Sequence, residues 1–172
     1  TTEFIVIQDP EIIYEIGKVT AASLKSVGQA FRSWIGRMIM RRMFGRRGAE
    51  TLAELAPELE GLADLYNSGT DWILNEAPVL LLFCADSAGG YGSENANLAV
   101  QNAVLAAETI GLGCFYSGFV GMANGRSDKI AKLVSLPETH EIYGTLAMGY
   151  PRLKYSKWVE RNPAKVTWVG FD

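Results

Sequence analysis

The stretch Gly111-Leu112-Gly113-Cys114-Phe115-Tyr116-Ser117-Gly118-Phe119 decides most of what this sequence predicts. Its three glycines and its serine are more small residues than a helix end alone requires. Small residues allow backbone N–H groups to approach the edge of a planar ligand. The alternative is a glycine that ends a helix, followed by a buried strand. Taken by themselves, these residues favour neither interpretation.

The segments on either side of this loop indicate the architecture. Residues 94–110 form a long Ala-rich pattern that is apolar almost all round, which predicts a helix buried on several sides, within the domain or at a subunit interface. Before it, residues 79–85 are continuously apolar, as in a central strand covered on both faces. After the loop, residues 127–134 read as a helix and residues 141–148 as another strand.

The first part of the chain adds one strand and several helices. Residues 3–8 read as a strand, and Asp9-Pro10 is a typical helix start. Helices are expected at residues 11–26, 30–44, 52–66 and 70–74, with breaks at Gly45, Gly48 and near Pro57, and a terminal strand at 166–169. Strands separated by helices predict an α/β (α+β) fold, a three-layer α-β-α sandwich, in a single domain spanning residues 1–172.

Composition excludes several classes of site. His140 is the only histidine, so neither a hydrolytic triad nor a closed zinc site is expected. The loop glycines follow a helix rather than a strand, unlike the dinucleotide fingerprint. Cys84 and Cys114 lie in apolar surroundings and read as structural thiols in a reducing compartment, so we expect a cytoplasmic protein. Neither a membrane-spanning run nor a signal peptide is expected.

Charge is distributed unevenly although the net charge is only −3. No acidic residue lies between Gly17 and Ala49, whereas eight basic residues do, interleaved with Trp34 and other large apolar residues. The segment has no nucleic-acid motif, so nucleic acid is not expected as a partner. A membrane-surface helix fits better. A helical lid over a cleft or a dimer fits best, and membrane association is not expected.

Short motifs from Ala77 onward resemble, in their order, those of the FMN-dependent nitroreductase family, most closely a branch often attached to ferredoxin-like iron–sulfur modules. These motifs are Ala77-Pro78, Gly111-Leu112-Gly113, Tyr116-Ser117-Gly118-Phe119, Leu136-Pro137-Glu138, Tyr143-Gly144, Gly149-Tyr150-Pro151, Lys154-Tyr155 and Arg161-Asn162-Pro163. The likeness extends over residues 3–172. The family's N-terminal Arg-Arg-Ser-type and Gln-Pro motifs have no counterpart here, so an N-terminal family segment is expected to be absent from this chain. Cys114-Phe115 stands where the branch has Thr-Cys.

The resemblance implies a cofactor, a partner and a reaction. Phe115, Tyr116, Ser117 and Gly118 would line the isoalloxazine ring of FMN, and Arg161 would pair with its phosphate. The site would lie between the subunits of an intertwined homodimer, with residues 94–110 at the interface and residues 166–169 crossing to the partner. Trp34 would shape the acceptor pocket.

The implied reaction is a ping-pong electron transfer. NAD(P)H or a ferredoxin-type donor would reduce FMN, and a small-molecule acceptor such as a quinone or nitroaromatic would reoxidise it. Two alternatives remain open. One is other flavin chemistry on the same fold, such as reductive dehalogenation or flavin fragmentation. The other is a truncated protein without catalysis, dimeric or peripheral to a membrane.

Overall fold

The computed structural model describes residues 2–153, 156–157 and 159–170, so the predicted motif residues Lys154 and Tyr155 lie outside the described part. In chain order the elements are β1 (Thr2–Ile7), α1 (Pro10–Ala30), α2 (Trp34–Asn67), β2 (Val79–Asp86), α3 (Gly92–Thr109), β3 (Gly113–Tyr116), α4 (Gly118–Asn124), α5 (Lys129–Leu133) and β4 (His140–Gly149).

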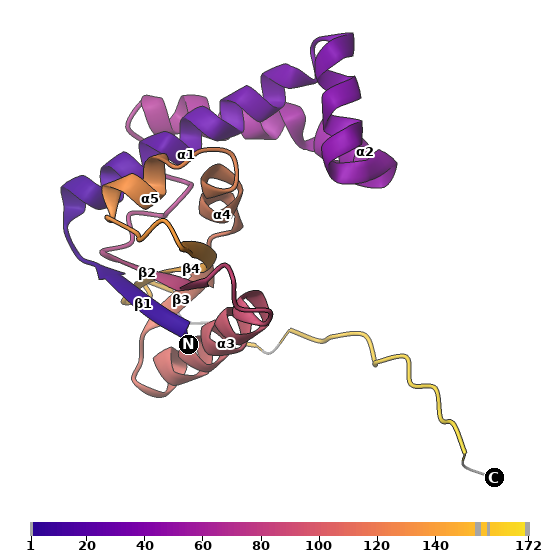
Figure 1. Ribbon diagram of the computed structural model, residues 1–172. Coiled ribbons are helices and arrows are strands. Elements are labelled where there is room, and N and C mark those ends of the chain that lie inside the picture. Colours follow the sequence, from indigo (N-terminus) through magenta and orange to yellow (C-terminus); the bar gives the residue numbers. More distant parts are fainter. Residues whose placement is uncertain (1, 154–155, 158, 171–172) are drawn as a thin grey trace.

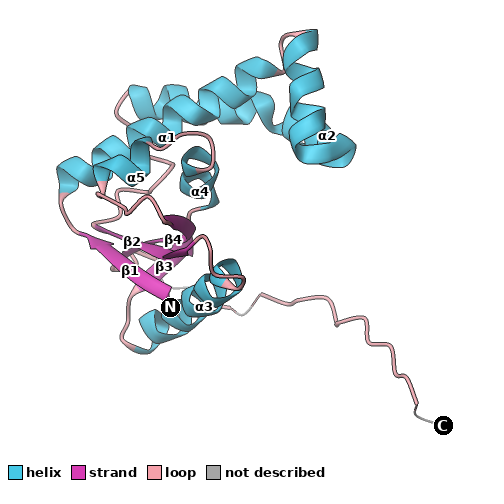
Figure 2. Cartoon of the chain, viewed as in Figure 1, coloured by secondary structure: helices cyan, strands magenta, loops and turns pink. Residues whose placement is uncertain are grey.

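The four strands form one antiparallel sheet in the order β1-β2-β4-β3 (Figure 2). β2 therefore lies inside the sheet, between β1 and β4, as its continuous apolar run predicted. Leu80, Leu82, Phe83 and Cys84 on β2 are all fully buried. β3 is an edge strand and pairs only with β4, from Gly113 opposite Gly149 to Tyr116 opposite Leu146.

Helices cover both faces of the sheet, which confirms the three-layer sandwich (Figure 1). α1, α4 and α5 lie on one face, where Leu80, Leu82 and Cys84 join the larger core cluster. α3 lies on the other face, where Phe83 and Leu146 pack with Ala96 and Val100 in a second cluster. α2 forms an outer layer against α1.

The first helix starts where the sequence predicted. The Asp9 carboxylate accepts hydrogen bonds from the backbone N–H of Glu11 (2.8 Å) and of Ile12 (3.3 Å), and Pro10 opens the helix. The helix runs to Ala30, four residues beyond the predicted end, because Leu24 and Val27 continue its buried face.

The predicted breaks in α2 are only partly observed. Gly45 has φ +70° and ψ 174°, so it interrupts the helix, whereas Gly48 is helical. Pro57 does not interrupt it. The short helix predicted at residues 70–74 is absent from the structure. Asp71 instead accepts hydrogen bonds from the backbone N–H groups of Ile73, Leu74 and Glu76, which fold this segment into turns.

The terminal strand predicted at residues 166–169 does not form. The described residues 159–170 are exposed and contain neither helix nor strand, and the segment extends away from the body (Figure 1). Neither sheet edge formed by the described residues pairs with this segment, and a strand needs such a neighbour to form.

Candidate functional site

The predicted loop begins as a helix end and continues as a strand. Gly111 has φ +75°, a conformation that glycine adopts without steric cost, and the Leu112 N–H donates back to the Ala107 carbonyl (2.9 Å). Gly113 then opens β3. The helix-end interpretation is therefore correct for Gly111, but the strand that follows is an exposed edge rather than a buried one.

Two aromatic rings of β3 are accessible on the surface. Phe115 is 36% exposed and Tyr116 is 50% exposed, and the Tyr116 hydroxyl donates to the Tyr143 carbonyl (3.4 Å). Successive residues of a strand point to opposite faces, so the two rings lie on opposite sides of the sheet edge. The edge therefore offers an aromatic surface to a ligand on either side.

Ser117 is turned inward, where sequence alone could not place it. The residue is 3% exposed, and its N–H donates to the Thr145 carbonyl (2.9 Å). The Ser117 and Thr145 hydroxyls are both buried and have no hydrogen-bond partner among the described residues. Buried polar atoms without partners are rare, so they mark this region as one that a bound water or ligand group can complete.

Gly118 leaves open space beside the Tyr116 ring. A Cβ built on Gly118 would meet only Tyr116, at 3.8 Å, so the backbone here is approachable. With the exposed rings and the unpaired hydroxyls, this arrangement fits the edge and face of a planar ring system. The loop has no basic side chain that could bind a phosphate group. A side chain that binds the phosphate must therefore come from another part of the protein.

Arg161 and Trp34 are not brought to this loop within one chain. Arg161 lies in the exposed terminal segment that leaves the body (Figure 1). Trp34 is the first residue of α2 and is 68% exposed, on a helix that packs against α1 rather than on the sheet edge. Of the predicted site residues, only Phe115, Tyr116, Ser117 and Gly118 lie together.

Sequence reasoning missed Thr145. Thr145 lies inside an apolar strand, and nothing in the local pattern separates it from a β-branched core residue. Its link to Ser117 depends on the pairing of β3 with β4, which the sequence does not specify.

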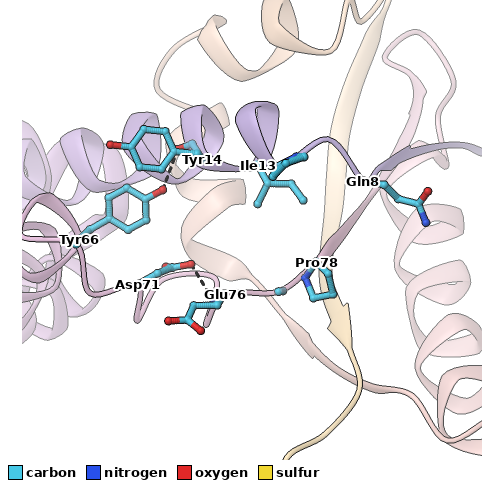
Figure 3. Close-up of a pocket in the computed structure, with 10 residues that line it drawn as sticks. Gln8, Ile13, Tyr14, Tyr66, Asp71, Glu76 and Pro78 are labelled. Atoms are coloured by element: carbon cyan, nitrogen blue, oxygen red, sulfur yellow. Dashed lines mark hydrogen bonds between the residues drawn. The ribbon is translucent and has the colours of Figure 1, made fainter.

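A surface pocket of about 390 Å³ lies away from β3, where the ends of β1 and α2 meet the start of α1 (Figure 3). Tyr14 and Tyr66 stack with centroids 5.9 Å apart, and the Tyr66 hydroxyl donates to the Tyr14 carbonyl (2.8 Å). Burial, and then the Asp71 carboxylate, raises the pKa of Tyr66 well above its usual range. The charged side chains that line the pocket, Asp71 and Glu76, are acidic, so it does not suit a phosphate.

Cys84 and Cys114 are free thiols, and His140 is the first residue of β4. Burial, assisted by Glu3, raises the pKa of Cys84 to about 11, and burial with Glu108 raises the pKa of Cys114. Both thiols therefore keep their protons at neutral pH, as expected of structural thiols. His140 lies 3.4 Å from Glu3 and contacts its neighbour Thr139.

Neither a metal site nor a membrane span is found among the described residues. In that part of the chain no three His, Cys, Asp or Glu side chains are grouped to hold a metal ion. No helix there is both long and apolar enough to cross a bilayer.

Solved structures with this arrangement include two FMN-bound proteins. A nitroreductase from Desulfitobacterium hafniense with bound FMN matches with a TM-score of 0.62 at 18% identity, covering 98% of this chain and 75% of that one. An iodotyrosine deiodinase bound to FMN and 3-iodo-L-tyrosine matches with a TM-score of 0.61 at 22% identity, covering 99% and 77%. At these identities the likeness is one of fold.

Sequence comparison supplies the family. A protein of Methanothermobacter thermautotrophicus named "Putative NADH dehydrogenase/NAD(P)H nitroreductase" is 30% identical over 97 residues, 54% of this chain and 49% of that protein. The match thus spans about half the length of the relative. The sequence profile of the Nitroreductase family matches residues 1–150, nearly the whole folded body. The chain therefore belongs to the nitroreductase family.

Proposed function

We propose that this protein is an FMN-dependent oxidoreductase whose flavin lies against the β3 edge. The observation that carries the proposal is the edge itself, where exposed Phe115 and Tyr116, open Gly118 and the unpaired Ser117 hydroxyl lie within four consecutive residues. Family membership and the FMN-bound proteins of the same fold support this choice of ligand.

Each residue would have a separate task toward FMN. Phe115 or Tyr116 would contact the isoalloxazine face, and Gly118 would let the ring edge approach the backbone. The Ser117 N–H, which donates to the Thr145 carbonyl, would hold the loop beneath the ring, and the Ser117 hydroxyl would be available to a polar atom at the ring edge. Arg161 would bind the phosphate, since a guanidinium forms two parallel hydrogen bonds to such an anion.

The proposal requires a second subunit. Arg161 lies on an exposed segment that extends away from the body of its own chain, and α3 exposes Leu98 and Leu105. A homodimer would cover α3 and carry each terminal segment to the flavin of the other subunit. Isolated exposed leucines are common, but exposed leucines on α3 together with a terminal segment that extends away from the body favour association.

FMN would supply two-electron chemistry, accepting a hydride from NAD(P)H or electrons from a ferredoxin-type donor and passing them to a quinone, nitroaromatic or similar acceptor. The protein would bind and orient both reactants in the same cleft at different times. No side-chain acid or base is required for hydride transfer.

Trp34 belongs to the proposed acceptor pocket only if a second subunit brings it beside the β3 edge. Trp34→Ala would then change the preference among quinone, nitroaromatic and halophenol acceptors and leave the FMN content unchanged. Equal effects on all acceptors, or loss of FMN, would remove Trp34 from the pocket.

The decisive experiment is reconstitution of the purified protein with FMN, followed by gel filtration and a visible spectrum. Retained flavin bands, bleached by NAD(P)H and restored by an acceptor, are expected. A protein that stays colourless at saturating FMN contradicts the proposal and favours the non-catalytic alternative. Bands that dithionite bleaches but NAD(P)H does not would exclude NAD(P)H as the donor.

A further inference from the structure

The first half of α2 is a basic arm, residues 34–47, that the body of the molecule does not cover (Figure 1). It continues beyond the end of α1 and lies at the edge of the molecule. Only Met40 on the arm is buried. Six large apolar side chains on it are exposed, between 41% and 68%: Trp34, Ile35, Met38, Ile39, Met43 and Phe44.

Local structure holds the arm in a defined orientation. Ser33 accepts a hydrogen bond from the Gly36 N–H (3.0 Å) and caps the helix. Gly36 packs so closely on α1 that an added Cβ would lie 2.0 Å from the Ala30 carbonyl oxygen. The exposure of the apolar side chains is therefore set by packing at Gly36 and Met40.

The arm carries five arginines and no acid: Arg37, Arg41, Arg42, Arg46 and Arg47. The net charge of the chain is −3, so the rest of the chain carries −8. Arg46 pairs with Glu50 on the next helical turn (3.0 Å), and Arg37 donates to the Phe31 carbonyl. Arginine and apolar side chains are interleaved rather than confined to opposite faces.

We propose, in place of the lid that the sequence favoured, that the basic arm binds the surface of an anionic lipid bilayer. Ile35, Ile39 and Met43 follow one another at four-residue spacing and would enter the boundary between headgroups and acyl chains. The long arginine side chains on either side can reach outward to lipid phosphates, which accommodates their interleaved positions. The acidic remainder of the chain would be repelled, so the arm would face the membrane and the body would point away.

A bilayer suits this surface better than a second copy of the chain does. A rigid protein surface would have to supply apolar pockets and carboxylates in alternation around the helix, whereas a fluid headgroup layer rearranges around both kinds of side chain. The dimer proposed above is closed by α3 and the terminal segment, and of the arm only Trp34, at its first position, would approach the other subunit. Lipid binding stands independently of the proposed flavin chemistry, although a bilayer would also be the source of a lipid-soluble quinone.

The test is co-sedimentation of the full chain with vesicles of phosphatidylcholine alone or mixed with phosphatidylglycerol. Binding to the mixed vesicles alone, reversed at high salt, is expected. Arg41→Ser with Arg42→Ser should weaken binding roughly 30-fold, since each basic residue near an anionic surface contributes about a factor of five. Ile39→Ser with Met43→Ser, which keeps every charge, should weaken binding to the same vesicles.

A control variant tests whether the effect is specific to the arm, and light scattering tests whether a second subunit covers the arm instead. Arg126→Ser with Lys129→Ser removes two exposed charges from the body and should leave vesicle binding unchanged. Equal loss in this control, equal binding to neutral vesicles, or no binding at all overturns the proposal. If vesicles are not bound and the Arg41/Arg42 variant instead dissociates a dimer in light scattering, the arm is a subunit interface.

Discussion

At the scale of single residues, Arg161 tests the proposed phosphate contact. A charge-assisted hydrogen bond from a guanidinium contributes about 1.5–3 kcal/mol, so Arg161→Ala should weaken FMN binding by that amount. Fluorescence titration of the apoprotein with FMN measures the change. Lys165→Ala removes a positive charge from the same exposed segment and should cost much less. Equal losses of FMN affinity in the two variants would show that Arg161 contributes only its positive charge and makes no specific contact with the phosphate.

The two thiols give a pH-dependent prediction. The pKa of Cys84 is raised to about 11 and the pKa of Cys114 is also raised, so both residues stay protonated at neutral pH. Because only the thiolate reacts with a disulfide reagent, labelling of the folded protein should be slow at pH 7 and accelerate as the pH rises. Cys114, which is half-buried, should react before fully buried Cys84.

Two measurements separate this prediction from simple inaccessibility. Cys114→Ser should remove the faster phase and leave the slower one. Unfolding in urea should make both thiols react at the rate of a model peptide thiol. A fast phase at pH 7 that persists in the Cys114→Ser variant would mean that Cys84 is exposed and that the core around β2 is misassigned.

At the scale of secondary-structure elements, the contact of β4 with α3 depends on Gly144. A Cβ added there would lie 2.5 Å from a Val100 methyl carbon and 3.6 Å from Phe83. Valine has little freedom to rotate away in a helix, so Gly144→Ala should destabilise the protein by about 1–3 kcal/mol through overpacking. Urea unfolding measures the free energy.

A double variant identifies the cause of that loss. Val100→Ala removes the clashing methyl groups, so the Gly144→Ala change should cost less in the Val100→Ala background than in the wild type. Gly61→Ala is the matched control, because Gly61 is helical with open space around it and alanine should add about 0.5–1 kcal/mol of stability there. Additive effects of Gly144→Ala and Val100→Ala would show that the two residues do not touch.

At the scale of the whole molecule, we predict a homodimer formed through α3. Ala106 is exposed on this helix, so Ala106→Arg should produce a monomer in light scattering and abolish FMN retention with it. Ala103 packs against the core beneath α3, and arginine there would damage the subunit itself. Ser26→Arg places the same charge on an exposed position of α1 and should leave the dimer intact. A monomeric Ala106→Arg protein that still retains FMN would contradict the shared site.

Much of the fold could be read from local patterns. The continuous apolar run of β2 predicted its interior position, and Asp9-Pro10 predicted the start of α1, because burial on both faces and helix capping each depend on a few adjacent residues. Gly45 broke its helix as predicted, whereas Gly48 and Pro57 did not. Turn formation at residues 70–74 was missed because Asp71 binds three backbone N–H groups rather than starting a helix.

Some features of the candidate site likewise follow from adjacent residues, whereas others depend on tertiary contacts. The sequence by itself determined that Phe115, Tyr116, Ser117 and Gly118 lie together, since they are consecutive. It also determined that eight basic residues and no acid lie between Gly17 and Ala49. Only the tertiary structure decided that β3 is an exposed edge, that Ser117 turns inward to Thr145, and that Arg161 and Trp34 stay apart from the loop. Strand order, register and exposure depend on contacts between residues distant in the chain, and no local pattern encodes those contacts.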